Sequence, residues 1–286
     1  MNCGKKLQKA ALALTISAGF AVGVAAQAIE QTKPAASQKG FTWTEAYEGS
    51  GNSTEWISDI NSTVGYNFGG HFGVYFGAPY YLFHPSSSLV GVTSANGFGN
   101  PYLGFGYSHK IDMVNFSTGL NASAPVSNAK KDGLSTGHVT FDWSNHVDHD
   151  FGFVKPFLSF GVANSIPDTR FQQRSFLSFG KLAHFEAGPE FDLGDKFSVT
   201  VSGYYIAPWG VQQTFVRGNS GPGGGEKTGT AALTRDSGMN FGFDFDATRS
   251  IDIYAGYSRS TSLSDNTFSI GVAFNISEAL KPRAIR

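Results

Sequence analysis

Segments of about ten residues with alternating apolar and polar side chains recur along the chain. In residues 267–276, Phe268, Ile270 and Val272 would face one side of a strand, whereas Thr267 and the other odd-numbered residues would face the opposite side. A period of two residues is typical of a β-strand with one apolar face. This pattern predicts twelve strands, near residues 41–48, 55–68, 71–83, 98–109, 113–124, 136–148, 152–163, 175–191, 196–209, 238–247, 250–258 and 266–276.

The connections between these segments alternate between short and long. The short ones are rich in glycine or charge, as hairpin turns are, and comprise residues 69–70, 110–112, 149–151, 192–195 and 248–249. The long ones are polar and comprise residues 49–54, 84–97, 125–135, 164–174, 216–237 and 259–265. Short turns at one end and long loops at the other are typical of outer-membrane barrels. We therefore predict an all-β fold, a single transmembrane antiparallel barrel of about twelve strands with both termini on the periplasmic side.

The N-terminal region resembles a secretory signal in its chemistry. Three lysines at positions 5, 6 and 9 precede an apolar run over residues 10–26, and the small-residue pattern Ala26-Gln27-Ala28 follows. We expect cleavage after Ala28; an uncleaved anchor helix is the alternative. The predicted division of the chain is a signal peptide (1–28), a periplasmic segment (29–40), the barrel (41–276) and a periplasmic tail (277–286).

Composition narrows the function classes. The net charge of −1 argues against a nucleic-acid partner, which would require a basic surface. The single cysteine, Cys3, precedes the apolar run, so the mature chain would have no disulfide, thiol nucleophile or cysteine metal site. The expected location is the outer membrane of a Gram-negative bacterium, with lipid, a small solute and the barrel-assembly machinery as partners. A soluble periplasmic β-protein is the alternative.

The polar faces of the strands would line the lumen. The candidate pore-lining residues are mostly acidic: Asp59, His138, Asp142, Lys155, His184, Glu186, Glu190, Asp244, Asp246 and Asp252. An acidic lumen would attract cations and repel anions. The alternative is that these carboxylates pair with Lys155, Lys181 or loop arginines in a solvated network. The opposite faces, which would contact lipid, carry residues such as Ile60, Phe76 and Phe243.

Several other residues suggest chemistry without a diagnostic pattern. The histidines at 138, 146, 149 and 184 lack a metal-site spacing, so we predict no metal and no cofactor. His84 and Ser86 are two residues apart, as in barrel lipid hydrolases, but no third group is marked to orient them, so we predict no enzyme activity. Pro79 and Pro208, which cannot donate to a strand ladder, mark a candidate lateral gap in the wall; the alternative is that these prolines simply end strands.

Residues 97–107 and 114–120, the pair Ala124-Pro125 and the segment 192–199 resemble the outer-membrane barrel family named for the meta-pathway of phenol degradation. That resemblance implies a transporter barrel linked to uptake of aromatic or other hydrophobic compounds. The chain departs from many outer-membrane barrels at its C-terminus, which continues past Phe274 to Arg286 instead of ending on an aromatic residue.

Three functional hypotheses follow. The first is a cation-preferring channel that uses Asp142, Glu186, Glu190, Asp244 and Asp246. The second is a transporter of hydrophobic compounds with a wall gap near Pro79 and Pro208. The third is a non-conducting barrel that displays loops. We predict a channel or transporter of small solutes.

Overall fold

The computed structural model describes residues 39–51, 55–69, 71–85, 95–126, 138–165, 176–216, 226–229, 235–262 and 264–279. Within them the elements are β1 (Gly40–Gly51), β2 (Glu55–Gly69), β3 (Phe72–Pro85), β4 (Ala95–Phe98), β5 (Tyr102–Ile111), β6 (Val114–Ser123), β7 (Thr140–His149), β8 (Val154–Ala163), β9 (Phe176–Phe179), β10 (Leu182–Asp192), β11 (Phe197–Pro208), β12 (Gln212–Val216), β13 (Glu226–Gly229), β14 (Asp236–Thr248), β15 (Ile251–Ser260), β16 (Asn266–Asn275) and α5 (Ile276–Ala279). In this part of the chain no helix is long and apolar enough to cross a membrane.

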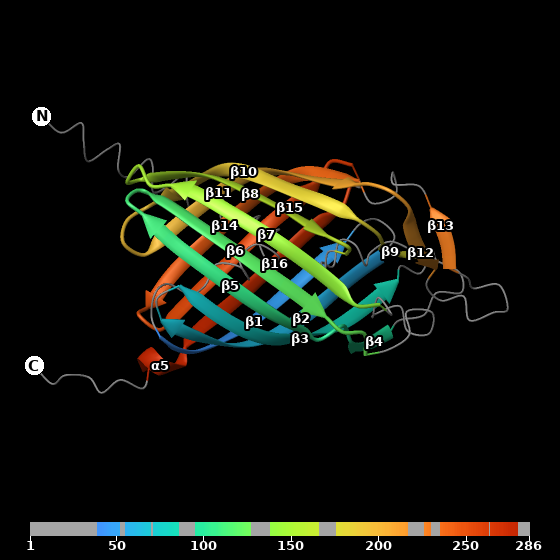
Figure 1. Ribbon diagram of the computed structural model, residues 1–286, viewed down its shortest axis with the longest axis horizontal. Helices are drawn as coiled ribbons and strands as arrows, with labels where there is room; N and C mark the ends of the chain where they lie inside the picture. Colours follow the sequence, from blue (N-terminus) through green and yellow to red (C-terminus); the bar gives the residue numbers. More distant parts are fainter. Residues whose placement is uncertain are drawn as a thin grey trace, which may run out of the picture.

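The long strands close into a barrel (Figure 1). Hydrogen-bonded neighbours follow the order β2-β1-β16-β15-β14-β11-β10-β8-β7-β6-β5-β3, and β3 pairs again with β2. Every pair is antiparallel, and β1 pairs with β16, so the first and last strands complete the cylinder. The predicted twelve-stranded antiparallel barrel is confirmed. Among the described strands, these twelve form a closed ring, which removes the two edges that an open sheet of the same strands would have.

The two faces of the strands have the predicted phase. On β2 and β3, Ile60, Phe68 and Phe76 face outward and are 45%, 53% and 56% exposed. The two sequence neighbours of Ile60, Asp59 and Asn61, face inward and are buried. An apolar outer face with a polar interior is the pattern of a barrel surrounded by lipid rather than of a soluble sandwich.

The structure departs from the predicted strands at the loop end of the barrel, the end that carries the long connections. The predicted strand 98–109 is divided at Asn100-Pro101. As a result, β5 pairs with Phe72–Gly77 of β3, and β4 pairs with Tyr80–Phe83, nearer the loop end of the same strand. The predicted strand 175–191 is likewise divided into β9 and β10. Strands β9, β12 and β13 form a separate small sheet beyond the barrel (Figure 1, right).

At the opposite end, here called the turn end, a short helix follows the last strand. Figure 1 shows α5 beside the start of β1 at the turn end, and the Phe41 amide donates a hydrogen bond of 2.8 Å to Ser277 Oγ. The predicted signal peptide, most of the predicted periplasmic segments, and residues 217–225 and 230–234 of the glycine-rich loop lie outside the described residues.

Aromatic and imidazole rings on the inner wall lie over glycines of the next strand. In each case ring and glycine are direct register partners, and a Cβ built on the glycine would come within 3.0 Å of the ring: Tyr75 with Gly104, Tyr102 with Gly77, His184 with Gly161, Tyr204 with Gly238, and Tyr254 with Gly271. The missing Cβ lets each ring lie along the wall and reach a residue beyond the neighbouring backbone.

Candidate functional site

The lumen is the site that the sequence predicted, and its loop-end half holds a hydrogen-bonded acidic layer. Asp142 on β7 and His184 on β10 are joined by an Oδ1···Nε2 contact of 3.0 Å. Strand β8 lies between them, and the His184 ring crosses it over Gly161. Both side chains are less than 10% exposed. The buried imidazole thus provides a direct partner for one lumen carboxylate.

Glu186 lies next along β10 on the inner face. Its Oε1 accepts hydrogen bonds from the Ser202 hydroxyl on β11 and from Asn240 Nδ2 on β14, the latter at 2.8 Å. Because a carboxylate only accepts, the Asn240 amide must direct its NH₂ group toward Glu186. These two donors are uncharged, so they hold the carboxylate without cancelling its charge.

Asp236 is fully buried at the start of β14. Tyr204 Oη donates to its Oδ2 at 3.0 Å, Ser260 Oγ donates to its Oδ1 at 2.5 Å, and the Ser237 amide donates to the same oxygen at 2.8 Å. These hydrogen bonds come from uncharged donors and hold the carboxylate in place despite its burial. Asp236 is not among the predicted lumen residues, because it falls in the predicted loop 216–237.

A tyrosine organises the opposite side of the loop-end half. Tyr102 on β5 lies over Gly77 and donates a hydrogen bond of 3.0 Å to Asn61 Oδ1 on β2, beside the buried Asp59. Its hydroxyl also lies 2.5 Å from Thr63 Oγ1. The acidic layer therefore continues around the inner wall on β2 and β5.

Apolar side chains cap this layer toward the loops. Two buried clusters occupy inward positions at the loop ends of their strands, one with Ile57, Tyr81 and Phe83, and another with Ala163, Leu182, Tyr204 and Ile206. With these residues and the carboxylates all below 10% exposure, the loop-end half of the lumen has little contact with solvent. A solute passing through would meet apolar groups first and carboxylates next.

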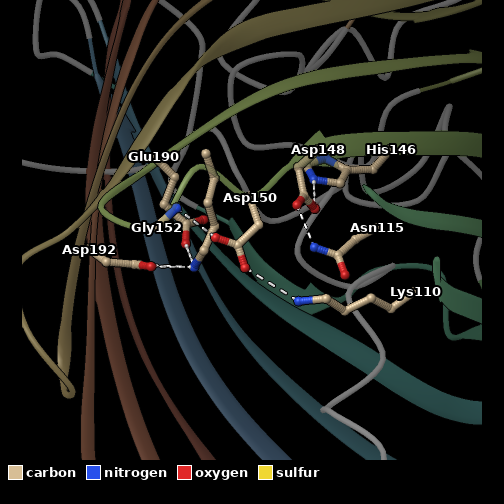
Figure 2. Close-up of polar contacts among 9 residues, drawn as sticks. Lys110, Asn115, His146, Asp148, Asp150, Gly152, Glu190 and Asp192 are labelled. Carbon is tan, nitrogen blue, oxygen red and sulfur yellow. Dashed lines mark hydrogen bonds and ion pairs between the residues drawn. The ribbon is translucent and has the colours of Figure 1, made fainter. Parts of the chain in front are cut away.

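The turn-end half is more open and holds the lumen lysine. Lys155 Nζ on β8 lies 3.1 Å from Glu190 Oε1 and 2.7 Å from Asp192 Oδ2, with the Lys155 and Glu190 side chains 25% and 22% exposed. The pairing of Lys155 with lumen carboxylates, which was the alternative to a purely cation-attracting lumen, is thus present at the turn end. Figure 2 shows Glu190 and Asp192 in the same region as two further acids, Asp148 and Asp150.

These two acids have partners of their own at the turn end. Asp148 accepts a hydrogen bond from Asn115 Nδ2 and lies 3.4 Å from His146 Nε2. Asp150, in the β7–β8 turn, accepts a 2.9 Å bond from the Gly152 amide and lies 3.3 Å from Lys110 Nζ. The Gly152 bond first, and then Lys110, lower the pKa of Asp150 below its ordinary value.

The remaining predicted lumen residues lie on the inner face without forming one compact centre. Asp244 and Asp246 lie on β14, and Asp246 is the register partner of Asp252 on β15, at the turn end. His138 precedes β7, and its backbone carbonyl accepts a hydrogen bond from Asn100 Nδ2. Residues His146, His149 and His184 are separated along the wall, and the described residues contain no group of three or more metal-ligating side chains.

The two prolines of the candidate gap lie within paired strands, Pro79 in β3 opposite Asn61 and Pro208 at the end of β11. The Pro79 carbonyl accepts a 2.9 Å hydrogen bond from the Gly99 amide, next to β4. Pro208 is the register partner of Leu182, and the following amide of Trp209 donates to the Lys181 carbonyl. The lateral gap stays a prediction. Ser86, the serine two residues after His84, lies outside the described residues.

Comparison of the chain with protein-family models gave no match. Comparison with curated proteins likewise gave no match. Among solved structures, an outer-membrane channel from Pseudomonas putida F1 is similar with a TM-score of 0.60 and 10% identity, over 84% of this chain and 98% of that one. The toluene transporter TbuX from Ralstonia pickettii has a TM-score of 0.44 and 8% identity, over 82% of this chain and 88% of that one. The first of these similarities shows that this chain has the fold of an outer-membrane β-barrel.

Proposed function

We propose that this chain is an outer-membrane channel of a Gram-negative bacterium that passes small solutes and prefers cations. The observation that carries the proposal is the charge of the inner wall. Asp59, Asp142, Glu186 and Asp236 are buried there in the loop-end half, and the hydrogen bonds described above reach Glu186 and Asp236 from uncharged donors. Fixed carboxylates in a narrow lumen lower the energy of an entering cation and raise that of an anion.

The cations of the turn end fit this proposal. The lysines that the described strands direct toward the lumen, Lys110 on β5 and Lys155 on β8, are each held by carboxylates at the turn end. They therefore leave the acidic character of the loop-end layer unchanged. Selectivity would arise in that layer, and the more solvent-exposed turn end would serve as a vestibule.

A second candidate function is supported by the apolar clusters at the loop end. Ile57 and Phe83 on one side and Leu182 and Ile206 on the other would favour an apolar solute at the entrance. A transporter of aromatic or other hydrophobic compounds would bind there and release its solute into the lumen or through the candidate gap at Pro79 and Pro208. Under either proposal lipid surrounds the barrel, the assembly machinery inserts it after signal-peptide cleavage, and it has no enzymatic role.

Ion conductance of the mature protein in a planar bilayer under a salt gradient tests the first proposal. We expect a steady current whose reversal potential shows cation preference. The double variant Asp142→Asn/Asp244→Asn should lower that preference, whereas Asp195→Asn, in an exposed turn outside the lumen, should leave it unchanged. Selectivity that is the same in the lumen double variant and the native protein would overturn the cation channel.

The hydrophobic-transport proposal is tested by uptake of an aromatic compound into vesicles that contain the inserted barrel. Leu182→Asn and Ile206→Asn should slow this uptake while ion selectivity is retained. Uptake that is insensitive to both variants would remove the second candidate.

A further inference from the structure

Two histidines lie together on the outer side of the barrel at its turn end. His71 lies in the turn between β2 and β3, and His109 lies near the end of β5. The Ser108 amide donates a 2.9 Å hydrogen bond to the His71 carbonyl, so the strand ladder fixes the two backbones side by side. His109 shares the outward phase of Phe105 and Tyr107, and it pairs across the sheet with Phe116. The lumen network therefore does not include this pair.

The two rings face each other through their nitrogens. His109 Nδ1 lies 3.3 Å from His71 Nε2, with ring centroids 4.5 Å apart and planes inclined by 77°. The Tyr107 ring supports both imidazoles, with centroids 5.7 Å from His71 and 6.4 Å from His109. Two nitrogen ligands of a tetrahedral Zn²⁺ ion, each about 2.0–2.1 Å from the metal, lie about 3.3 Å apart. The separation of the ring nitrogens thus matches that of a metal-bound pair.

We propose that His71 and His109 form a two-histidine site for a divalent transition-metal ion. Imidazole nitrogen is a preferred ligand of Cu²⁺ and Zn²⁺, and Cu²⁺ is the tighter binder by the general order of metal affinities. In the metal-free pair one ring donates to the other, so binding requires His71 to carry its proton on Nδ1 and His109 on Nε2, leaving both facing nitrogens unprotonated. Water or other oxygen ligands complete the coordination.

The site is built before the metal arrives. The hydrogen bond from the Ser108 amide to the His71 carbonyl holds the two backbones side by side, so binding requires no loop closure, and small rotations of the two rings suffice. Once one imidazole holds the ion, the second binds it as an intramolecular ligand at high effective concentration. The site is independent of the proposed channel activity, because neither histidine lines the lumen.

Copper titration of the mature barrel in detergent micelles tests the proposal. Electron paramagnetic resonance combined with electron spin echo envelope modulation, at pH 7.5, should show one Cu²⁺ bound by two imidazoles. His71→Ala and His109→Ala should each weaken binding by about tenfold or more and leave a single-imidazole signal. His149→Ala, which removes another turn-end histidine, should change neither affinity nor signal.

Two results would overturn the site. One is a native spectrum with fewer than two coordinated imidazoles. The other is unchanged copper affinity in the double variant His71→Ala/His109→Ala. On electrophoresis gels, slower migration of the heated sample than of the unheated sample verifies that each variant is folded. Both side chains are peripheral, so folded variants are expected.

Discussion

His184 Nε2 on β10 and Asp142 Oδ1 on β7 lie 3.0 Å apart although a complete strand, β8, separates their backbones. The contact exists because β8 places Gly161 beneath the imidazole. Any side chain there would displace the ring and leave Asp142 without its imidazole partner. The acidic layer thus depends on a residue that has no side chain of its own.

Gly161→Ala should destabilise the barrel by about 1–3 kcal/mol, since the new methyl group would lie within 3.0 Å of both the His184 ring and the Trp143 carbonyl. Urea unfolding of the vesicle-inserted protein, followed by tryptophan fluorescence, measures this loss. Gly203→Ala is the matched control, because its nearest heavy atom would be 3.8 Å away. Equal stability of the two variants would contradict the packing argument.

Tyr204→Phe should cost about 1–3 kcal/mol of unfolding free energy, because it removes the hydroxyl that donates to the fully buried Asp236. The neighbouring Tyr205 points outward and is 41% exposed, so Tyr205→Phe should be near neutral. The same urea titration compares the two variants. If Tyr205→Phe proved the more harmful, the inner-wall assignment of Tyr204 would be wrong.

Lys155→Met should increase the cation preference of the proposed channel. It removes the positive charge that Glu190 and Asp192 now hold at the turn end. One unit charge about 4 Å from an ion's path changes its energy by about 1 kcal/mol in water, which corresponds to about fivefold in permeability. Reversal potentials measure the change, and Lys181→Met, outside the lumen, is the control. A shift toward anions would conflict with the proposal.

Glu45→Lys should lower stability in lipid vesicles by about 2 kcal/mol. Glu45 lies on the outer face of β1, where Ser62 Oγ donates to it at 2.7 Å and Trp43 Nε1 at 2.9 Å. Lysine would remove that acceptor and place a cation on the lipid side, where lysine is unfavourable. Asp195→Lys, the same reversal in an exposed turn, should stay within about 0.5 kcal/mol. Similar losses for both reversals would argue against a lipid-facing Glu45.

Local alternation determined much of the fold. Because side chains alternate between the faces of a strand, the pattern alone predicted that Ile60 and Phe76 face outward and that Asp142, Glu186 and Asp244 face inward. The alternation of short and long connections predicted an even number of antiparallel strands. The apolar–polar alternation did not predict strand positions correctly at β4 or at Asp236. A strand of four residues, or one that begins after a glycine-rich run, contains too few alternating positions to be recognised.

The sequence by itself determined which residues share a face, since that depends only on neighbours along one strand. Only the tertiary structure decided which of them meet, because contacts between strands depend on register and on the glycines that let a ring cross a backbone. His184 reaches Asp142 through Gly161, Tyr204 reaches Asp236 beside Gly238, and His71 lies against His109 across the β3–β5 pair. Those contacts join positions 42, 32 and 38 residues apart, a separation that strand periodicity does not encode.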